Sequence, residues 1–151
     1  MTIEEKRNFL KRYHEFVYIA RNFGKQIREL RLSVLPGGIQ YSDMPSAPSH
    51  GDRLASYMAR LDELSEKYEN ALDAVFETHK AIDGLENAKH RVILNMRYVE
   101  RKRVWEIAKQ LNYSERRVKQ MQNDALARIE IDPLVVKNAD NTHGMMAKED
   151  G

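Results

Sequence analysis

The sequence contains no cysteine, which excludes a disulfide framework and any metal site built from thiolates. It has no glycine-rich loop of the kind that binds phosphate. No apolar run approaches the roughly 20 residues that a helix needs to span a bilayer. The first residues, MTIEEKRNFLKRY, also lack the apolar segment of a secretory signal. These absences lead us to expect a cytoplasmic protein that does not enter a membrane.

Histidines and carboxylates are present, but their spacing does not suggest an active site. The five histidines are scattered and form no i, i+4 pair: His14, His50, His79, His90 and His143. Between residues 62 and 73 the acidic residues are spaced like the solvated flank of a coiled coil. We therefore expect no metal centre, no cofactor and no enzymatic activity.

The length of 151 residues and the apolar content of 42% suffice for one small domain with an extended helical element. Residues 1–35 are expected to form one long helix, because apolar residues recur there in alternating steps of four and three. These residues are Phe9, Tyr13, Phe16, Ala20, Phe23, Ile27, Leu30 and Val34. Residues 36–51 are rich in Pro, Gly and Ser and are expected to form a loop.

A second helix with similar spacing is expected from Asp52 onward. Its apolar residues are Leu54, Met58, Leu61, Tyr68, Leu72, Val75 and Ile82. Residues 1–35 hold 8 Lys and Arg against 4 Asp and Glu, whereas residues 52–86 hold 4 against 9. Opposite charge favours pairing of the two helices as an antiparallel hairpin of about 45 Å. Two helices alone leave bulky aromatic residues uncovered, so we expect self-association, as a homodimer, through this region.

Residues 104–128 have the spacing of two helices that cross at a short turn. Ala108 provides the small side chain that a close crossing requires, with Ile107 and Leu111 facing inward beside it. Asn112 is a residue type that tolerates the left-handed backbone of a turn, and Ser114 can cap a second helix that begins at the next residue. Val118, Met121 and Ala125 then fall on the inner face of that helix. The pattern predicts a helix-turn-helix.

The outward residues of such a motif carry its function, because the start of the second helix lies against base edges in the major groove of DNA. Base reading is predicted for Ser114, Glu115, Arg116, Lys119 and Gln120, and phosphate contact for Arg101, Lys102, Arg103, Lys109 and Arg117. Residues 87–131 hold 11 Lys and Arg against 5 Asp and Glu, which fits binding to phosphates. The alternatives are a helical pair with a solvated charged face and, for residues 101–103, a solubilising loop.

Around this motif the sequence predicts a short helix at about residues 87–99, whose Val92, Ile93, Met96 and Tyr98 cover the two motif helices. Trp105 is expected in the core of the resulting three-helix head. Pro133 is expected to end the last helix, and the polar residues beyond it to form a disordered tail. The expected fold is all-α, with a helical hairpin over residues 1–84, a three-helix DNA-binding head over residues 85–131 and a tail over residues 132–151.

Residues 85–131 resemble sigma-70 region 4 and, more closely, small phage late transcription regulators that are similar to that region. The resemblance rests on MRYVE at residues 96–100, WEIA at residues 105–108, NYSER at residues 112–116, Val118, and the Ala-Leu pair at residues 125–126. The long helices and the Pro/Gly loop before the motif also resemble this group. The resemblance implies binding to double-stranded DNA near promoters in a bacterial host cell, contact with host RNA polymerase and activation of late phage genes.

Two functions remain open for a helix-turn-helix joined to long helices. One is a transcription regulator of the kind that the resemblance implies. The other is a DNA-recognition subunit of phage packaging, similar to a small terminase subunit. Ring-sized oligomers that bind near packaging genes favour the second function, whereas a dimer that binds near a promoter favours the first. A weaker third interpretation makes the hairpin an adaptor for another protein.

Overall fold

The computed structural model describes residues 1–34 and 50–149, with side chains for residues 1–34 and 51–141. Within these ranges the chain forms helices and no strand: α1 (Ile3–Lys11), α2 (Tyr13–Ser33), α3 (His50–Asp83), α4 (Ala88–Leu94), the π-helical turn η2 (Asn95–Val99), α5 (Val104–Leu111), α6 (Glu115–Arg128) and α7 (Pro133–Glu149). The predicted all-α class is confirmed. None of these helices is both long and apolar enough to cross a membrane. The loop predicted at residues 36–51 lies outside the described residues, except that residues 50 and 51 open α3.

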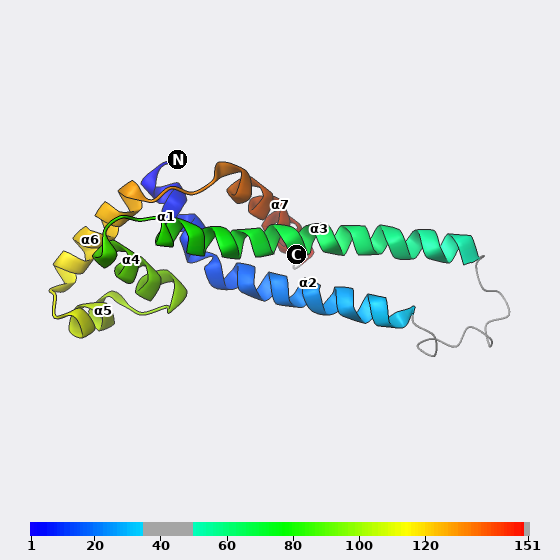
Figure 1. Cartoon of the computed structure of the whole chain (residues 1–151), viewed down its shortest axis with the longest axis horizontal. Helices are drawn as coiled ribbons and strands as arrows, with labels where there is room; N and C mark the ends of the chain where they lie inside the picture. Colours follow the sequence, from blue (N-terminus) through cyan, green and yellow to red (C-terminus); the bar gives the residue numbers. More distant parts are fainter. Residues whose placement is uncertain (35–49, 150–151) are drawn as a thin grey trace.

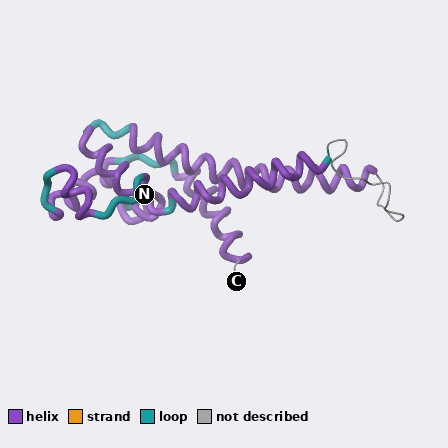
Figure 2. Tube along the Cα trace, turned by 90° about the horizontal axis from the view of Figure 1, so that it is seen from below, coloured by secondary structure: helices purple, strands orange, loops and turns teal. Residues whose placement is uncertain are grey.

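Helices α2 and α3 lie side by side and run in opposite directions, while α4, α5 and α6 gather at one end of the molecule (Figures 1 and 2). The seam predicted for the first long helix is correct over most of its length. Phe9, Tyr13, Phe16, Ala20, Phe23 and Ile27 are buried, Leu30 is half-buried and Val34 is exposed. The heptad spacing of this segment therefore identified the face that packs.

On α3 the predicted apolar series is only partly correct: Ile82 is buried and Leu61, Tyr68 and Val75 are partly buried against the core, whereas Leu54 and Met58 are exposed. A stripe of buried residues, three of them alanines, recurs along α3 in steps of three and four: Leu64, Lys67, Ala71, Ala74, Thr78 and Ala81. Alanines bring the two helices close together, and a Cβ on Gly24 of α2 would lie 3.2 Å from the Tyr68 ring. The most buried stripe of α3 is therefore offset by about one residue from the predicted series, most of which is partly buried.

Lys67 occupies this seam with only 8% of its surface exposed. Its Nζ lies 5.4 Å from the centre of the Phe23 ring and donates a hydrogen bond of 3.2 Å to Oε1 of Glu63. This hydrogen bond, together with the positive charges of Lys67 and Arg60, holds the pKa of Glu63 below its ordinary value. The charge of Lys67 is thus paired at the edge of the seam.

The first long helix is also broken, at Arg12, where the sequence predicted continuity. The Arg12 N–H donates to the carbonyl of Phe9 at 3.1 Å and α2 begins at the next residue. The Arg12 guanidinium pairs with Asp140 of α7 and lies 4.7 Å from the Phe16 ring centre. The bend turns α1 toward α6, so that Phe9 and Leu10 share a buried cluster with Leu126. One buried cluster therefore contains residues of α1, α2, α3, α6 and α7.

The predicted disordered tail is instead helical from Pro133 onward. The Asp132 carboxylate accepts a hydrogen bond of 2.9 Å from the Leu134 N–H, and the Asp132 N–H donates to Glu77 of α3 at 2.9 Å. Proline suits the first position of a helix, where no N–H is needed, and aspartate suits the cap before it. Ala139 is fully buried, and α7 packs against α3. Pro133 thus starts a helix that covers the same buried cluster.

Candidate functional site

Helices α5 and α6 form a tightly packed pair joined by three residues. Ala108 of α5 is 5% exposed and belongs to one buried cluster with Ile107, Val118 and Met121, to which Ile93 and Met96 add the face of α4 and η2. The predicted inner residues of both helices are therefore correct. Because this cluster fixes the pair from the inner side, the opposite side of α6 is fixed as well.

The turn between these helices has the predicted local structure. Asn112 has φ 58° and ψ 42°, the left-handed conformation, and the Tyr113 N–H donates to the carbonyl of Ala108 at 2.9 Å. Ser114 caps α6, since its hydroxyl oxygen accepts a hydrogen bond of 3.1 Å from the Arg117 N–H. Two polar residues therefore set the angle at which α6 leaves the turn.

An Asn112→Ala substitution should lower the free energy of unfolding by about 1 kcal/mol, because alanine keeps the β-carbon that the left-handed conformation disfavours and lacks the short polar side chain with which asparagine offsets that cost. An Asn112→Gly substitution should stay within about 0.5 kcal/mol of the native protein, since glycine loses this strain but has a freer unfolded chain. Chemical denaturation of the three proteins measures the difference. Equal loss in both variants would show that the backbone at residue 112 is not under strain.

One aromatic and one aliphatic residue, Trp105 and Val92, do not lie in the core where the sequence placed them. Trp105 is 53% exposed and Val92 is 44% exposed, so neither belongs to the core of the head. Trp105 precedes the buried Ile107 by two residues, which is about 200° around a helix. Ile93 and Met96, and not Trp105, belong to the buried cluster of α5 and α6.

The outward side of the first half of α6 carries most of the residues predicted to read bases. Glu115, Arg116, Lys119 and Gln120 are exposed, and no hydrogen bond or ion pair to the described part of the chain involves their side chains. The fifth, Ser114, is exposed too, but its oxygen is used for the cap. The structure brings four polar side chains together with their hydrogen-bonding groups free.

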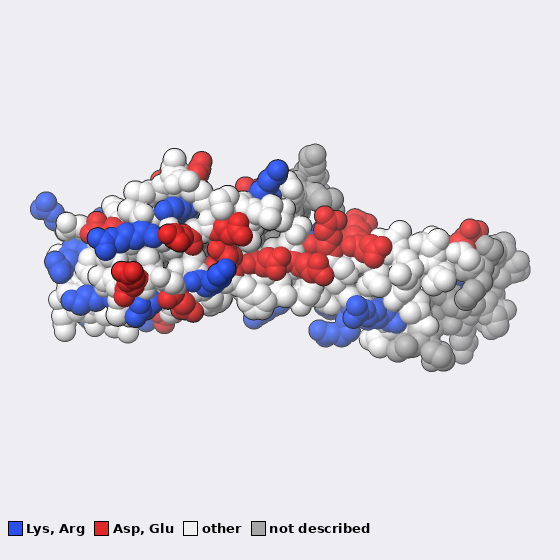
Figure 3. All heavy atoms as spheres, turned by 45° about the horizontal axis from the view of Figure 1, so that its top comes forward, with Lys and Arg blue, Asp and Glu red and all other residues white. Residues whose placement is uncertain are grey.

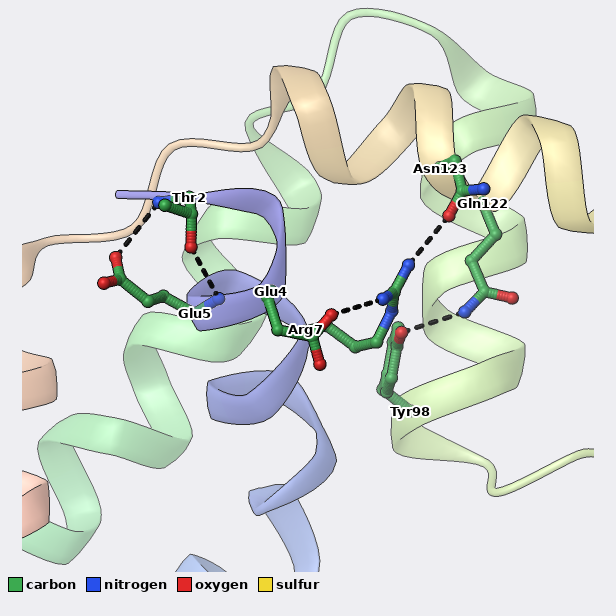
Figure 4. Close-up of polar contacts among 7 residues, drawn as sticks. All are labelled: Thr2, Glu4, Glu5, Arg7, Tyr98, Gln122 and Asn123. Atoms are coloured by element: carbon green, nitrogen blue, oxygen red, sulfur yellow. Dashed lines mark hydrogen bonds and ion pairs between the residues drawn. The ribbon is translucent and has the colours of Figure 1, made fainter.

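The second half of α6 is docked on α1 (Figure 4). Arg7 donates from Nη2 to Oδ1 of Asn123 at 2.8 Å and from Nη1 to Glu4 at 2.7 Å. Gln122 donates to the hydroxyl of Tyr98 at 2.9 Å. These contacts hold the second half of α6 against α1 and η2.

The residues predicted to contact phosphates differ in how free they are. Arg101, Arg103 and Lys109 are exposed. Lys102 is half-buried, and its Nζ donates to Gln110 at 2.8 Å and lies 3.8 Å from Glu100. Arg117 is exposed and stacks with its guanidinium 5.3 Å from the Tyr113 ring centre. The first three are the better placed to bind an anion.

A pocket that the sequence did not predict lies beside Arg101. Lys11, His14, Arg97, Tyr98 and Arg101 line this pocket of about 120 Å³, which has no carboxylate in its lining. The Nε of Arg97 is buried without a hydrogen-bond partner, and Arg101 has a positive φ of 59°. An unpaired buried donor and a left-handed arginine are features of functional sites. Sequence spacing cannot find this pocket, because Lys11 and Arg97 belong to α1 and η2.

The described side chains include no group of three His, Asp or Glu residues arranged to hold a metal ion. Residues 49–130, more than half of the chain, match the family described as "Protein of unknown function (DUF1492)". This match contains all of α4, η2, α5 and α6. No curated protein and no solved structure matches the chain. The chain therefore belongs to the DUF1492 family.

Proposed function

We propose that this protein is a sequence-specific DNA-binding transcription regulator in which α5 and α6 act as a helix-turn-helix. One observation carries the proposal: the first half of α6 is anchored by Val118 and Met121 on its inner face and presents free polar side chains on its outer face. A recognition helix needs this combination, because it must be rigidly held and yet unpaired.

The exposed side chains suit the edges of base pairs. Arg116 can donate two hydrogen bonds to guanine, Gln120 can pair with adenine, and Glu115 can accept from cytosine. Lys119 can donate to guanine or to a phosphate. We assign base reading to these four residues, with Ser114 retained as the cap that positions them.

Phosphate contacts are assigned to Arg101, Arg103 and Lys109, supported by Lys102 and Arg117. Lys11 and Arg97, which line the cationic pocket with Arg101, extend this set to α1 and η2. Basic residues are distributed over the head on the face shown in Figure 3. Such contacts provide affinity without sequence preference and weaken as salt increases.

The resemblance to sigma-70 region 4 supplies the biological setting of the proposal. It favours a phage or prophage regulator that binds beside a promoter, contacts host RNA polymerase and activates late genes in the bacterial cytoplasm. The proposed architecture is a helical hairpin, formed by α2 and α3, followed by a three-helix head. We assign the hairpin to self-association. A protein of this kind binds DNA and partners and needs neither catalysis nor a cofactor.

A footprint over the late-gene control region of the phage or prophage genome, with and without host RNA polymerase and at two salt concentrations, tests this function. We expect protection beside a promoter that sharpens or extends when polymerase is added, and that weakens at high salt. Protection restricted to packaging genes and unaffected by polymerase would instead favour a terminase-like subunit. Absence of any protection at low salt would exclude both functions.

A further inference from the structure

The paired helices α2 and α3 leave a groove of about 530 Å³ along one side. Its lining is Val17, Ala20, Arg21, Gly24, Lys25 and Arg28 from α2, and Tyr68, Leu72 and Val75 from α3. Three residues of the apolar series that the sequence placed in the α2–α3 seam, Tyr68, Leu72 and Val75, line this groove. The same series continues toward the far end of α3 with Leu54 and Met58, which are 54% and 46% exposed. A heptad stripe that remains half-exposed indicates a further helical partner.

The order of residues around α3 gives the groove an acidic outer edge. Successive residues are about 100° apart on a helix. In the triplets Ala71-Leu72-Asp73 and Lys67-Tyr68-Glu69, the first residue is therefore buried in the seam, the second lines the groove and the third lies at its outer edge. The acidic residues at this edge are Asp62, Glu66, Glu69 and Asp73. Figure 3 shows acidic side chains gathered along α3.

Helix α2 gives the opposite edge a positive charge through Arg21, Lys25 and Arg28. In the described part of the chain, Arg21 and Arg28 form no ion pair, and neither do the four acidic residues at the outer edge of α3. The Nζ of Lys25 lies 4.0 Å from Oε1 of Glu29. The groove thus has an apolar floor, a basic edge and an acidic edge, with both edges available for an intermolecular partner.

We infer that this groove is occupied by the same groove of a second copy of the chain, in a four-helix bundle. An interface between identical copies must be self-complementary about a two-fold axis. If the axis runs parallel to the helices, α2 of each copy lies over α3 of its partner, and the basic edge meets the acidic edge. If the axis runs across the helices, α2 lies over α2 and like charges face each other. Charge complementarity fixes orientation in this way, so the parallel axis is selected.

This arrangement has a consequence for the heads. With the two-fold axis parallel to the helices, both copies of α4, α5 and α6 lie at the same end of the bundle. The inference rests on the groove alone and holds whether or not α6 binds DNA. For a DNA-binding protein, it would place two recognition helices where one duplex can contact both.

The first test is a charge exchange followed by sedimentation equilibrium without DNA. The native chain should be a dimer at micromolar concentration, and Arg21→Glu with Arg28→Glu should raise the dimer Kd by roughly tenfold or more. Asp62→Lys with Glu69→Lys should do the same, whereas the four substitutions together should restore the native Kd to within about threefold. Lys137→Glu with Arg128→Glu, which makes the same charge change on α7 and α6, is the control and should leave the Kd unchanged. A native monomer, or a dimer insensitive to these exchanges, would overturn the inference.

The second test measures orientation. Because the chain has no cysteine, Ser56→Cys at the far end of α3 provides a single site for a spin label. Helices in a bundle lie about 8–10 Å apart, so the two labels of a parallel pair should be within about 25 Å. In the crossed arrangement they should be roughly 40 Å apart, since residue 56 lies about 14 residues from the middle of the groove. The longer distance would refute the parallel axis even if the groove is the interface.

Discussion

Replacement of Arg116 by alanine is expected to reduce discrimination at one base pair of the binding site by about 5- to 150-fold, equivalent to about 1–3 kcal/mol. Arg116 is exposed on the first turn of α6 and has no partner in the described part of the chain, so its guanidinium is free to donate two hydrogen bonds to a guanine. The affinity for sequences that already lack this base pair should change little. Binding to a library of single-base variants of the selected site measures the effect at each position.

Arg101→Ala is the matched control, because it removes the same charge from an exposed residue that is assigned to phosphate. It should weaken binding to all sequences alike and reduce the slope of log K against log salt by about 1. Gln120→Ala should reduce discrimination at a different base pair from the one affected by Arg116→Ala. A uniform loss for Arg116→Ala that matches the control would refute the base-reading role.

Leu126→Ala should lower the free energy of unfolding by about 2–5 kcal/mol, the range for a fully buried leucine. Leu126 is 0% exposed and packs in the cluster that contains Phe9 and Leu10 of α1 and Ala139 of α7. Since this cluster also contains residues of α3, the head and the long helices should unfold in one cooperative transition. Urea denaturation followed by circular dichroism and by Trp105 fluorescence reports on both parts.

Leu134→Ala removes the same atoms from a leucine that is 63% exposed and serves as the control. Its effect should stay within about 0.5 kcal/mol. Separate transitions by the two probes would contradict a common core. An equal effect of the two substitutions would show that Leu126 is not packed as described.

The sequence predicted those features that depend on local chemistry. The turn at Asn112, the cap at Ser114 and the inner residues Ala108 and Val118 follow from residue type and spacing within about ten positions, and the structure confirms them. The buried face of α2 is also predicted correctly, because its large apolar residues coincide with its contacts. The roles of the outward residues in DNA binding remain predictions.

The features that the sequence did not predict depend on distant partners or on small side chains. Arg12 is neither Pro nor Gly, and the break there involves contacts with α7. On α3 the alanines pack because α2 approaches closely, while a search for large apolar residues selects the stripe beside them. Pro133 was predicted only as the end of a helix, whereas with Asp132 it forms the start of α7. The pocket around Arg97 requires Lys11, which comes from another helix.

The position of α1 on α6 also constrains the order in which the chain can fold during synthesis. The hydrogen bond between Arg7 and Asn123 spans 116 residues, and the pair formed by Arg12 and Asp140 spans 128. Chains emerge from the ribosome from the first residue onward. Phe9 and Leu10 are therefore made before α6 and α7, and they can contact Leu126 and Ala139 only after α6 and the first turns of α7 have emerged. Until then the apolar side of α1 is an exposed surface on which a chaperone can bind the nascent chain.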